Sequence, residues 1–277
     1  MLRQQTCTDR GPLWARNVPW DLRVTGCGDQ TTAGLPPRSG SLNVFLTLWN
    51  ACVTVCVRVR KEPSIGGPMA EILKLDNSPL AYVLEYAVRL ILCGKVVVIP
   101  TDTFYGLGAD PFNLAAVSEI FRIKRRTADR PLPLLVDSIE QAVDLANRPP
   151  ELFFKLARQF WPGPLTLVVP ASRQIPLKVT ANTGKVGLRW PQAPFVSALI
   201  AAAGRPLTGT SANLSDMSAC STADEVDCQL GDAVPLILDG GLTRGMLAST
   251  VVELEGEGGR IVRPGAISES ELKEFLD

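Results

Sequence analysis

The sequence contains no histidine. This absence excludes Ser-His-Asp and Cys-His nucleophilic catalysis, histidine-ligated zinc and proton relays through imidazole. Phosphate loops of the forms G-x-x-x-x-G-K-[ST] and G-x-G-x-x-G are missing as well. The chemistry must therefore come from lysine, arginine, carboxylates, hydroxyls, backbone amides or a metal that arrives with a ligand. A phosphate site in this chain must be built from side chains rather than from a glycine cradle.

An excess of charge of either sign is also absent, since 28 lysines and arginines balance 28 aspartates and glutamates. This balance argues against a protein that coats nucleic acid or an anionic membrane, although it permits a local basic patch. The seven cysteines are odd in number, and Cys52 and Cys56 have no second pair at the spacing of a zinc site. We therefore expect reduced thiols and a cytoplasmic location.

Residues 1–68 show no sustained helical or alternating pattern and end in a Pro- and Gly-rich run. Residues 39–57 are uncharged, but polar side chains interrupt them, and their apolar centre is shorter than the roughly 20 residues of a membrane span. We expect neither a membrane anchor nor a secretory signal. Met69 stands directly before the first regular pattern and is a candidate for the natural start. The sequence predicts a poorly ordered extension over 1–68 and one domain over 69–277.

From residue 70 onward, helical and strand patterns are interspersed. Apolar residues recur at helical spacing over 80–91, with Ser78 as a candidate N-cap and Pro79 at the first helical position. The predicted helices are 80–91, 114–121, 138–146, 151–160, 193–203 and one that Ser268 caps. The predicted strands are 95–100, 132–136, 165–169, 186–188, 206–210, 235–238, 250–254 and 260–262. This order predicts an α/β fold with helices packed on a twisted mixed β-sheet.

Polar residues gather where several of these strands end. Thr101, Thr103 and Tyr105 directly follow the strand 95–100, and a cluster of cations follows at Lys124, Arg125, Arg126 and Arg130. Later strand ends carry Arg189, Thr208, Thr210, Ser211, Asn213, Ser249 and Arg263. Each group alone is typical of a capped turn or a solvated helix end. Together, cations beside hydroxyl and amide donors at strand ends indicate a concave basic surface that binds phosphate or carboxylate.

These residues belong to motifs that occur in a fixed order. The motifs are Pro100-Thr-Asp-Thr-x-Tyr-Gly-Leu-Gly, Lys124-x-Arg126 with Pro131-Leu132, Pro162-Gly-Pro-Leu-Thr166, Val186-Gly-Leu-Arg189-x-Pro191, Thr210-Ser-Ala-Asn213-Leu-Ser, Leu238-Asp-Gly-Gly, Ser249-Thr-Val-Val and Arg263-Pro-Gly-Ala. With them the chain resembles the YrdC-type threonylcarbamoyl-AMP synthases over about two thirds of its length. It looks like the single-domain type, so the resemblance implies a single YrdC-like catalytic domain over 69–277.

The resemblance implies that L-threonine, bicarbonate and ATP yield threonylcarbamoyl-AMP and pyrophosphate. The threonine amine would take up bicarbonate, and the resulting carbamate would attack the α-phosphate, with Mg²⁺ carried by ATP and no dedicated protein metal site. A separate transferase complex would then use the product to modify tRNA, and weak tRNA binding is a further expectation. Lys124 and Arg126 would be catalytic and would bind ATP with Arg130, Thr210, Ser211, Asn213 and Arg263. Threonine would be held by Thr103, Arg189, Thr208 and Ser249, with Arg189 suited to its carboxylate.

Two positions depart from the family pattern. The family commonly reads Lys-Gly-Arg-Pro, whereas Arg125 and Thr127 stand at the second and fourth positions of this chain. A histidine that often follows the Pro-Leu segment is replaced by Val136 or a neighbour. Two other functions stay open, namely a non-catalytic RNA-binding module with a YrdC-like fold, and carbamoyl transfer as in the related domain of hydrogenase-maturation proteins. The zero net charge and the missing aromatic stacking pattern favour the synthase over the RNA-binding module.

Overall fold

The computed structural model describes residues 41–47, 54–60, 70–127, 130–245 and 247–276. The chain divides into two units, Met1–Ile65 and Gly66–Asp277. In the first unit, β1 (Ser41–Thr47) pairs with β2 (Thr54–Arg60) in an antiparallel hairpin. The sequence predicted no regular element there, but β-branched residues dominate β2 and favour a strand. The rest of the predicted extension lies outside the described residues, and its order stays a prediction.

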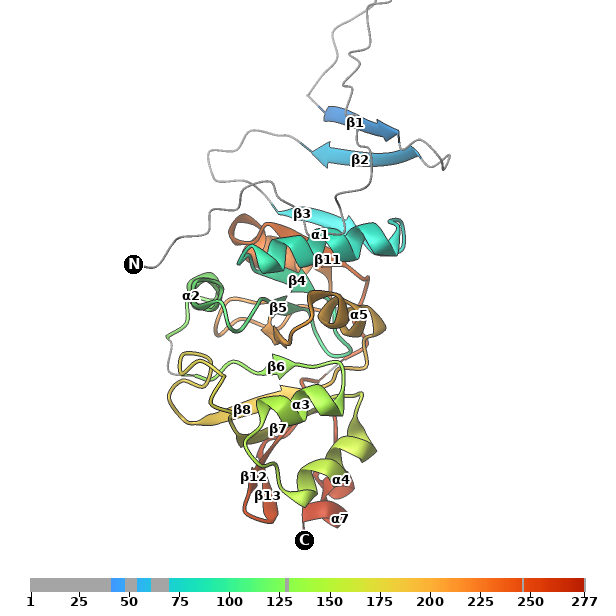
Figure 1. Cartoon of the computed structure of the whole chain (residues 1–277). Helices are drawn as coiled ribbons and strands as arrows, with labels where there is room; N and C mark the ends of the chain where they lie inside the picture. The colour runs from blue at the N-terminus through green and yellow to red at the C-terminus, as the bar shows by residue number, and fades with distance from the viewer. Residues whose placement is uncertain (1–40, 48–53, 61–69, 128–129, 246, 277) are drawn as a thin grey trace, which may run out of the picture. The chain divides into compact units, whose positions relative to one another are not determined.

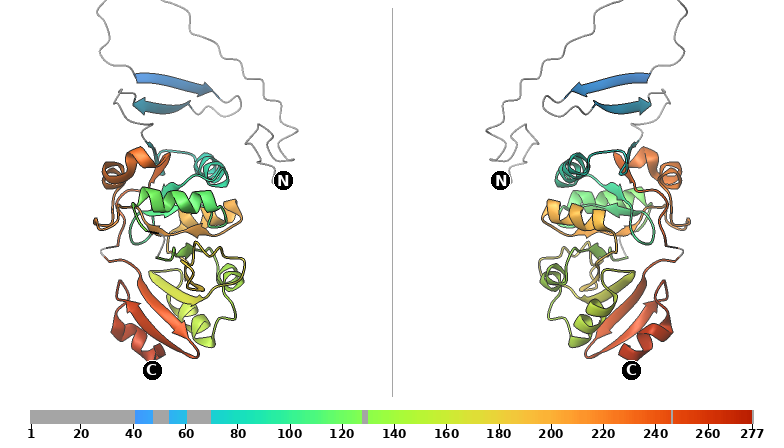
Figure 2. Two further views of the ribbon diagram at one scale, coloured as in Figure 1. Left: turned by 90° about the vertical axis from the view of Figure 1, so that its left-hand side faces the viewer. Right: turned by 90° about the vertical axis from the view of Figure 1, so that its right-hand side faces the viewer.

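The second unit contains two mixed β-sheets, with the six-stranded sheet drawn below the five-stranded one (Figures 1 and 2). The strand order of the five-stranded sheet is β10-β5-β4-β11-β3, where β11 is parallel to β3 and β4 and the other pairs are antiparallel. Its strands are β3 (Glu71–Lys74), β4 (Val97–Ile99), β5 (Gly106–Gly108), β10 (Thr210–Ser211) and β11 (Leu236–Asp239).

The second sheet has the order β13-β12-β7-β8-β6-β9, with parallel pairs at β12-β7 and β6-β8. Its strands are β6 (Leu134–Leu135), β7 (Leu165–Pro170), β8 (Lys185–Arg189), β9 (Leu207–Thr208), β12 (Thr250–Glu255) and β13 (Gly258–Arg263). The predicted mixed α/β class is confirmed, and the structure distributes the strands over two sheets instead of one.

The helices cover these sheets. They are α1 (Leu80–Leu92), α2 (Leu114–Ile123), α3 (Ile139–Leu145), α4 (Glu151–Phe160), α5 (Pro194–Ala203), α6 (Ala223–Leu230) and α7 (Glu269–Leu276), with a 3-10 turn at Gly231–Ala233. The helix α1 packs against α5, and α4 packs against α7 (Figure 1). Helix α1 begins at Leu80 with Pro79 in the N-cap position and no side-chain cap, so the predicted capping role of Ser78 is wrong.

Strand β4 shows why a continuous apolar run becomes a central strand. Val97 and Ile99 belong to the core formed with α1 and α5, whereas Val96 and Val98 belong to the larger core that includes α2 and α6. Successive side chains of a strand point to opposite faces, so a strand covered on both faces must be apolar throughout. The end of β4 is therefore rigidly placed, and the Thr101–Tyr105 loop leaves from it.

The predicted strand 206–210 is divided in the structure. Its first part, β9, pairs with β6 in the six-stranded sheet, and β10 pairs with β5 in the five-stranded sheet. Gly209 lies between them, and a Cβ atom there would come within 2.6 Å of the Leu135 side chain. The chain can cross from one sheet to the other at this point because glycine has no side chain. This crossing brings the ends of both sheets to one place.

Candidate active site

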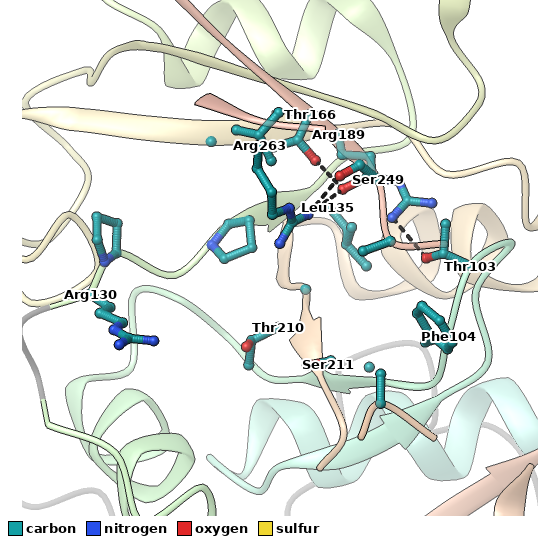
Figure 3. Close-up of a pocket in the computed structure, with 18 of the residues that line it drawn as sticks. Thr103, Phe104, Arg130, Leu135, Thr166, Arg189, Thr210, Ser211, Ser249 and Arg263 are labelled. Carbon is teal, nitrogen blue, oxygen red and sulfur yellow. Dashed lines mark hydrogen bonds between the residues drawn. The ribbon is translucent and has the colours of Figure 1, made fainter. Parts of the chain in front are cut away.

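A cavity of about 600 Å³ lies where the two sheets meet, with lining residues from β5 and β10 of one sheet and from β6, β7, β8, β12 and β13 of the other (Figure 3). Six cations line it: Lys124, Arg126, Arg130, Lys185, Arg189 and Arg263. The lining carboxylates are Asp216 and Glu253. The excess of positive charge makes the cavity suited to an anionic ligand.

The structure brings ten of the eleven predicted site residues to this cavity, and Thr208 is the exception. The Thr208 side chain is fully buried, and its hydroxyl donates to the Leu107 carbonyl over 2.8 Å and accepts the Ala109 N–H over 3.0 Å. Its hydroxyl therefore ties β9 to the end of β5. The position of Thr208 does not support the predicted contact with threonine.

Arg189, at the end of β8, is held by three protein acceptors. Its Nη2 donates to Asp102 Oδ1 over 2.6 Å, its Nη1 to Thr103 Oγ1 over 3.1 Å, and its Nε to the Gly163 carbonyl over 3.1 Å. The Arg189 and Asp102 side chains are only 8% and 12% exposed. A guanidinium with five N–H donors keeps two for a ligand after these contacts.

Thr101 and Thr103 form a hydroxyl turn after β4. Thr101 Oγ1 donates to the Phe104 carbonyl over 2.6 Å and accepts the Thr103 N–H over 3.2 Å. The Thr101 and Thr103 hydroxyl oxygens are 3.1 Å apart. The backbone of Gly245 packs directly on the backbone of Thr103, since a Cβ at Gly245 would overlap with it. The turn is thus enclosed by the loop that precedes Ser249.

Helix α2 ends in a Schellman motif, which positions Lys124 and Arg126. The Arg125 N–H donates to the Arg122 carbonyl over 3.1 Å, and the Arg126 N–H donates to the Phe121 carbonyl over 3.0 Å. Arg125 has a φ of 49°, in the left-handed region where the motif usually has glycine. The backbone turn therefore forms although this chain has arginine where the family commonly has glycine.

The Lys124 ammonium is buried. Among the described residues, it donates hydrogen bonds to three oxygen atoms of the loop after β10. Its Nζ lies 2.5 Å from the Ser211 carbonyl, 2.9 Å from the Asn213 carbonyl and 3.2 Å from Asn213 Oδ1. Burial, with a smaller contribution from the charge of Arg126, lowers the pKa of Lys124 to about 8. These three bonds use all three donors of the ammonium, so Lys124 fixes the loop after β10 while its charge faces the cavity.

Asn213 organises that loop. Its Oδ1 accepts from the Ser211 hydroxyl over 2.5 Å as well as from Lys124, and its Nδ2 donates to the carbonyls of Leu214 and Met217 over 2.8 and 2.6 Å. Because the proton of Ser211 is directed at Asn213, the Ser211 oxygen offers lone pairs to the cavity. Ser211 is therefore suited to accept from hydroxyl or amino groups of a nucleotide.

Arg263 and Ser249 form the opposite wall (Figure 3). Arg263 Nη2 donates to the Ser249 carbonyl over 2.7 Å and to Ser249 Oγ over 3.1 Å, and Ser249 Oγ lies 2.8 Å from Thr166 Oγ1. Burial and then the charge of Arg189 lower the pKa of Arg263, which remains cationic at neutral pH. Two cations near one another are stabilised by an anion between them.

Asp102 and Thr166 stand within the sequence motifs, but the sequence predicted no role for either of them. Thr166 is a polar residue inside the apolar strand β7, and this break in the pattern was a usable signal. Lys185 and Glu253 also line the cavity, and Glu253 is bonded to Lys185 over 2.8 Å and to Arg260 over 2.5 Å. The ion pair between Lys185 and Glu253 joins β8 to β12, two strands that are far apart in the sequence. Leu135 lines the cavity, whereas Val136 is fully buried and does not line it.

The described residues contain no group of three or more histidine, cysteine, aspartate or glutamate side chains that could hold a metal ion. The described helices include none that is long and apolar enough to cross a membrane.

The fold and the cavity define a mixed α/β protein with a cationic site for small anionic ligands. A family model for the Sua5/YciO/YrdC group, described as "Telomere recombination", matches residues 89–265. The chain belongs to this family.

Named relatives agree with this assignment. A threonylcarbamoyl-AMP synthase of Pyrococcus abyssi is 37% identical over 193 residues, which cover 70% of this chain and 57% of that protein. A threonylcarbamoyl-AMP synthase of Vibrio vulnificus is 38% identical over 162 residues, covering 57% of this chain and 86% of the relative. The crystal structure of Pyrococcus abyssi Sua5 complexed with L-threonine has a TM-score of 0.71 at 34% identity, over 76% of this chain and 61% of that chain. The chain therefore spans somewhat more than half of the Pyrococcus protein.

Proposed function

We propose that this chain is an L-threonylcarbamoyladenylate synthase, a nucleotidyltransferase that forms threonylcarbamoyl-AMP and pyrophosphate from L-threonine, bicarbonate and ATP. The observation that carries the proposal is the convergence of six cations and the Thr103–Arg189 cluster on one cavity. A triphosphate and an amino-acid carboxylate are both anions, and bringing them together requires charge neutralisation. The names of the relatives and the threonine complex of the Pyrococcus protein support the same reaction.

The reaction needs no covalent intermediate on the protein. The threonine amine reacts with bicarbonate to form a carbamate and water. A carbamate oxygen then attacks the α-phosphorus, the bond from this phosphorus to the oxygen bridging to the β-phosphate breaks, and pyrophosphate leaves. Holding the two reactants together and neutralising their charge are the contributions expected of the site.

The contacts favour a division of labour between the two walls. Arg126 and Arg130 would bind phosphate oxygens from the α2 side, and Arg263 from the β13 side. Lys124 would act through its charge and by holding the loop of Ser211, since its three protons already bond protein acceptors. Thr103, Arg189 and Ser249 would hold threonine, and Thr166 would position Ser249 through their 2.8 Å bond.

Mg²⁺ would enter as part of the nucleotide. Of the two carboxylates that line the cavity, Glu253 is bonded through one oxygen to Lys185 and through the other to Arg260. A hard cation prefers several oxygen ligands and keeps bound water, which the triphosphate and solvent supply. We therefore propose that the protein binds MgATP and not a metal of its own.

The remaining expectations concern the cell. We propose that a separate tRNA-modifying transferase complex receives the product, that the chain binds tRNA weakly, and that it works in the cytoplasm. The cationic cavity supports only the chemistry of nucleotide and amino-acid binding. These three statements rest on the family and on the cysteine usage.

The test uses the full chain with ATP, bicarbonate and L-threonine. We expect pyrophosphate release only when all three are present, and mass spectrometry should detect threonylcarbamoyl-AMP. Lys124→Ala should reduce turnover by at least 10²-fold, the usual size of a lost charged contact in a preorganised site. The control is Lys178→Ala, whose lysine bonds Ser118 Oγ over 2.6 Å and does not line the cavity. Near-normal turnover of the Lys124 variant contradicts the proposal.

The same assay separates the two other functions. An RNA-binding module would show salt-dependent RNA affinity without pyrophosphate release. A carbamoyl transferase would release pyrophosphate with carbamoyl phosphate in place of threonine and bicarbonate. Either result would replace the synthase assignment.

A further inference from the structure

The Thr101 hydroxyl has all of its hydrogen-bonding capacity filled by neighbouring protein atoms. A hydroxyl has one proton and two acceptor sites. The proton of Thr101 is donated to the Phe104 carbonyl, which can only accept, over 2.6 Å. One acceptor site takes the Thr103 N–H over 3.2 Å. In the 3.1 Å contact between the Thr101 and Thr103 hydroxyls, Thr103 must therefore be the donor.

The same count applied to Thr103 leaves a single acceptor site. Its proton goes to Thr101, and one lone pair accepts Arg189 Nη1 over 3.1 Å, because a guanidinium nitrogen can only donate. Thr103 lines the cavity and is 5% exposed. Its remaining lone pair is the only hydrogen-bonding site that its side chain offers to a ligand.

Arg189 presents the complementary polarity beside Thr103 (Figure 3). Asp102 and the Gly163 carbonyl fix its orientation, and two N–H groups remain after the contacts described above. A donor group and an acceptor oxygen thus lie 3.1 Å apart at the end of β4. An α-amino acid carries the matching pair, a carboxylate and an N–H group, both attached to its Cα atom.

We propose that Thr101 is a positioning residue that fixes the direction of the Thr103 hydroxyl proton, so that Thr103 accepts an N–H of the amino-acid substrate while Arg189 faces its carboxylate. The role depends on the function proposed above and names the polarity of its amino-acid subsite. An N–H is present in the amine and remains on the nitrogen of the carbamate. The contact therefore holds the same nitrogen before and after carboxylation.

The first test compares Thr101→Val with Thr101→Ser in the full chain. Valine keeps the shape of threonine but has no acceptor, so the Thr103 proton is free to turn toward the cavity and oppose the substrate N–H. We expect the KM for L-threonine to rise about tenfold, within the range for an unmatched buried donor, while the KM for ATP stays within about twofold. The serine variant keeps the hydroxyl and should resemble the wild type. Thr101→Ala carries the same test should the valine variant fail to fold.

The second readout separates proton direction from general disturbance. (R)-3-Hydroxybutyrate has the carboxylate and hydroxyl of threonine without the amine, and its Ki is measured against threonine. The preference of the wild type for threonine over this analogue should fall about tenfold in Thr101→Val and persist in Thr101→Ser. A merely structural defect weakens both ligands equally and leaves the ratio unchanged, as a double-mutant cycle requires.

Three outcomes decide the matter. A reduced ratio in the valine or alanine variant, with the ratio retained in the serine variant, supports the role of Thr101. If the wild type turns over threonine and the variants keep its preference for threonine over the analogue, the role of Thr101 is contradicted but the proposed function is not. A wild type that releases no pyrophosphate with threonine contradicts the proposed function and this role with it.

Discussion

Asp102 Oδ1 accepts a hydrogen bond from Arg189 Nη2 over 2.6 Å, and both side chains are nearly buried. The other carboxylate oxygen, Asp102 Oδ2, is buried without a hydrogen-bond partner in the described part of the chain. Asp102 does not line the cavity, whereas Arg189 does. The carboxylate therefore acts on the cavity through the guanidinium that it orients.

We expect Asp102→Asn to impair the use of threonine more than the use of ATP. The substitution keeps an acceptor for Arg189 but removes the charge, and disrupting a buried ion pair commonly costs about 3–5 kcal/mol. Steady-state kinetics should show kcat/KM for threonine falling about 10- to 100-fold, with a smaller change in the KM for ATP.

The matched control is Asp110→Asn, which breaks the 2.5 Å ion pair of Asp110 with Arg205 away from the cavity. It should lower the melting temperature without changing the KM for threonine. Equal kinetic effects of the two variants would show that Asp102 has no special relation to the amino-acid end.

Lys124 should make ATP binding dependent on pH. Its pKa of about 8 means that the ammonium loses its charge as the pH rises through 8. The triphosphate favours the charged form, so ATP affinity should fall between pH 7 and pH 9, by up to about tenfold per pH unit above the pKa. Calorimetry at pH 7, 8 and 9 measures the effect, and Lys124→Gln should remove it. A pH dependence that persists in this variant assigns the titration to another group.

The lowered pKa of Lys124 also affects the stability of the fold, which should increase with pH where ATP affinity decreases. The pKa of Lys124 in the folded chain lies below the roughly 10.4 of an unfolded lysine. Folding therefore disfavours the charged form, and this cost disappears as the pH rises from about 8 toward 10. Denaturant titrations measure the free energy of unfolding. Between about pH 8 and pH 10, this free energy should rise for the wild type relative to Lys124→Gln.

Arg125→Gly should stabilise the chain. Arg125 has a φ of 49°, and the left-handed conformation costs a residue with a Cβ atom about 1–2 kcal/mol. Glycine removes this cost but loses more backbone entropy on folding, so a net gain of about 1 kcal/mol is expected. The free energy of unfolding measures it. Arg125→Ala is the control, since it removes the same side chain, keeps Cβ and should bring no such gain.

Gly245→Ala should damage the amino-acid end of the cavity. A Cβ at this position overlaps with the Thr103 backbone, so the loop before Ser249 must move. We expect a higher KM for threonine and a lower melting temperature. At the control position Gly258, the nearest atom is the Glu255 carbonyl oxygen at 4.0 Å, and Gly258→Ala should leave the KM unchanged. A normal KM for threonine in Gly245→Ala would mean that the turn tolerates a displaced loop.

Local sequence signals predicted an element well where both its apolar periodicity and its capping residues were clear. Ser268 and Glu271 form a reciprocal capping box, with Glu271 N–H to Ser268 Oγ over 3.3 Å and Ser268 N–H to Glu271 Oε2 over 2.9 Å, which confirms the predicted cap of α7. Helix α6 was missed although Thr222 caps it and Glu225 stands three residues later. Its stripe of apolar residues is sparse, so the helical periodicity that marks the other helices is weak here.

The split of 206–210 into β9 and β10 was not predictable from a local pattern. The two halves pair with different sheets, and the close approach of Leu135 to Gly209 is a contact between distant segments. The same holds for Thr208, whose hydroxyl is used by residues about a hundred positions earlier.

Residue chemistry and order were enough to establish the α/β class, the absence of imidazole chemistry and the set of cations and hydroxyls that gather at the cavity. Periodicity and composition are local properties, so they can be read along the chain. The direction in which each hydroxyl or ammonium proton points, by contrast, is not a local property. Thr103 and Arg189 are 86 positions apart, and Lys124 is 87 from Ser211, yet these contacts decide which atoms face a ligand. Only the tertiary structure assigns them, because a hydroxyl or ammonium turns toward whichever acceptors the fold places around it.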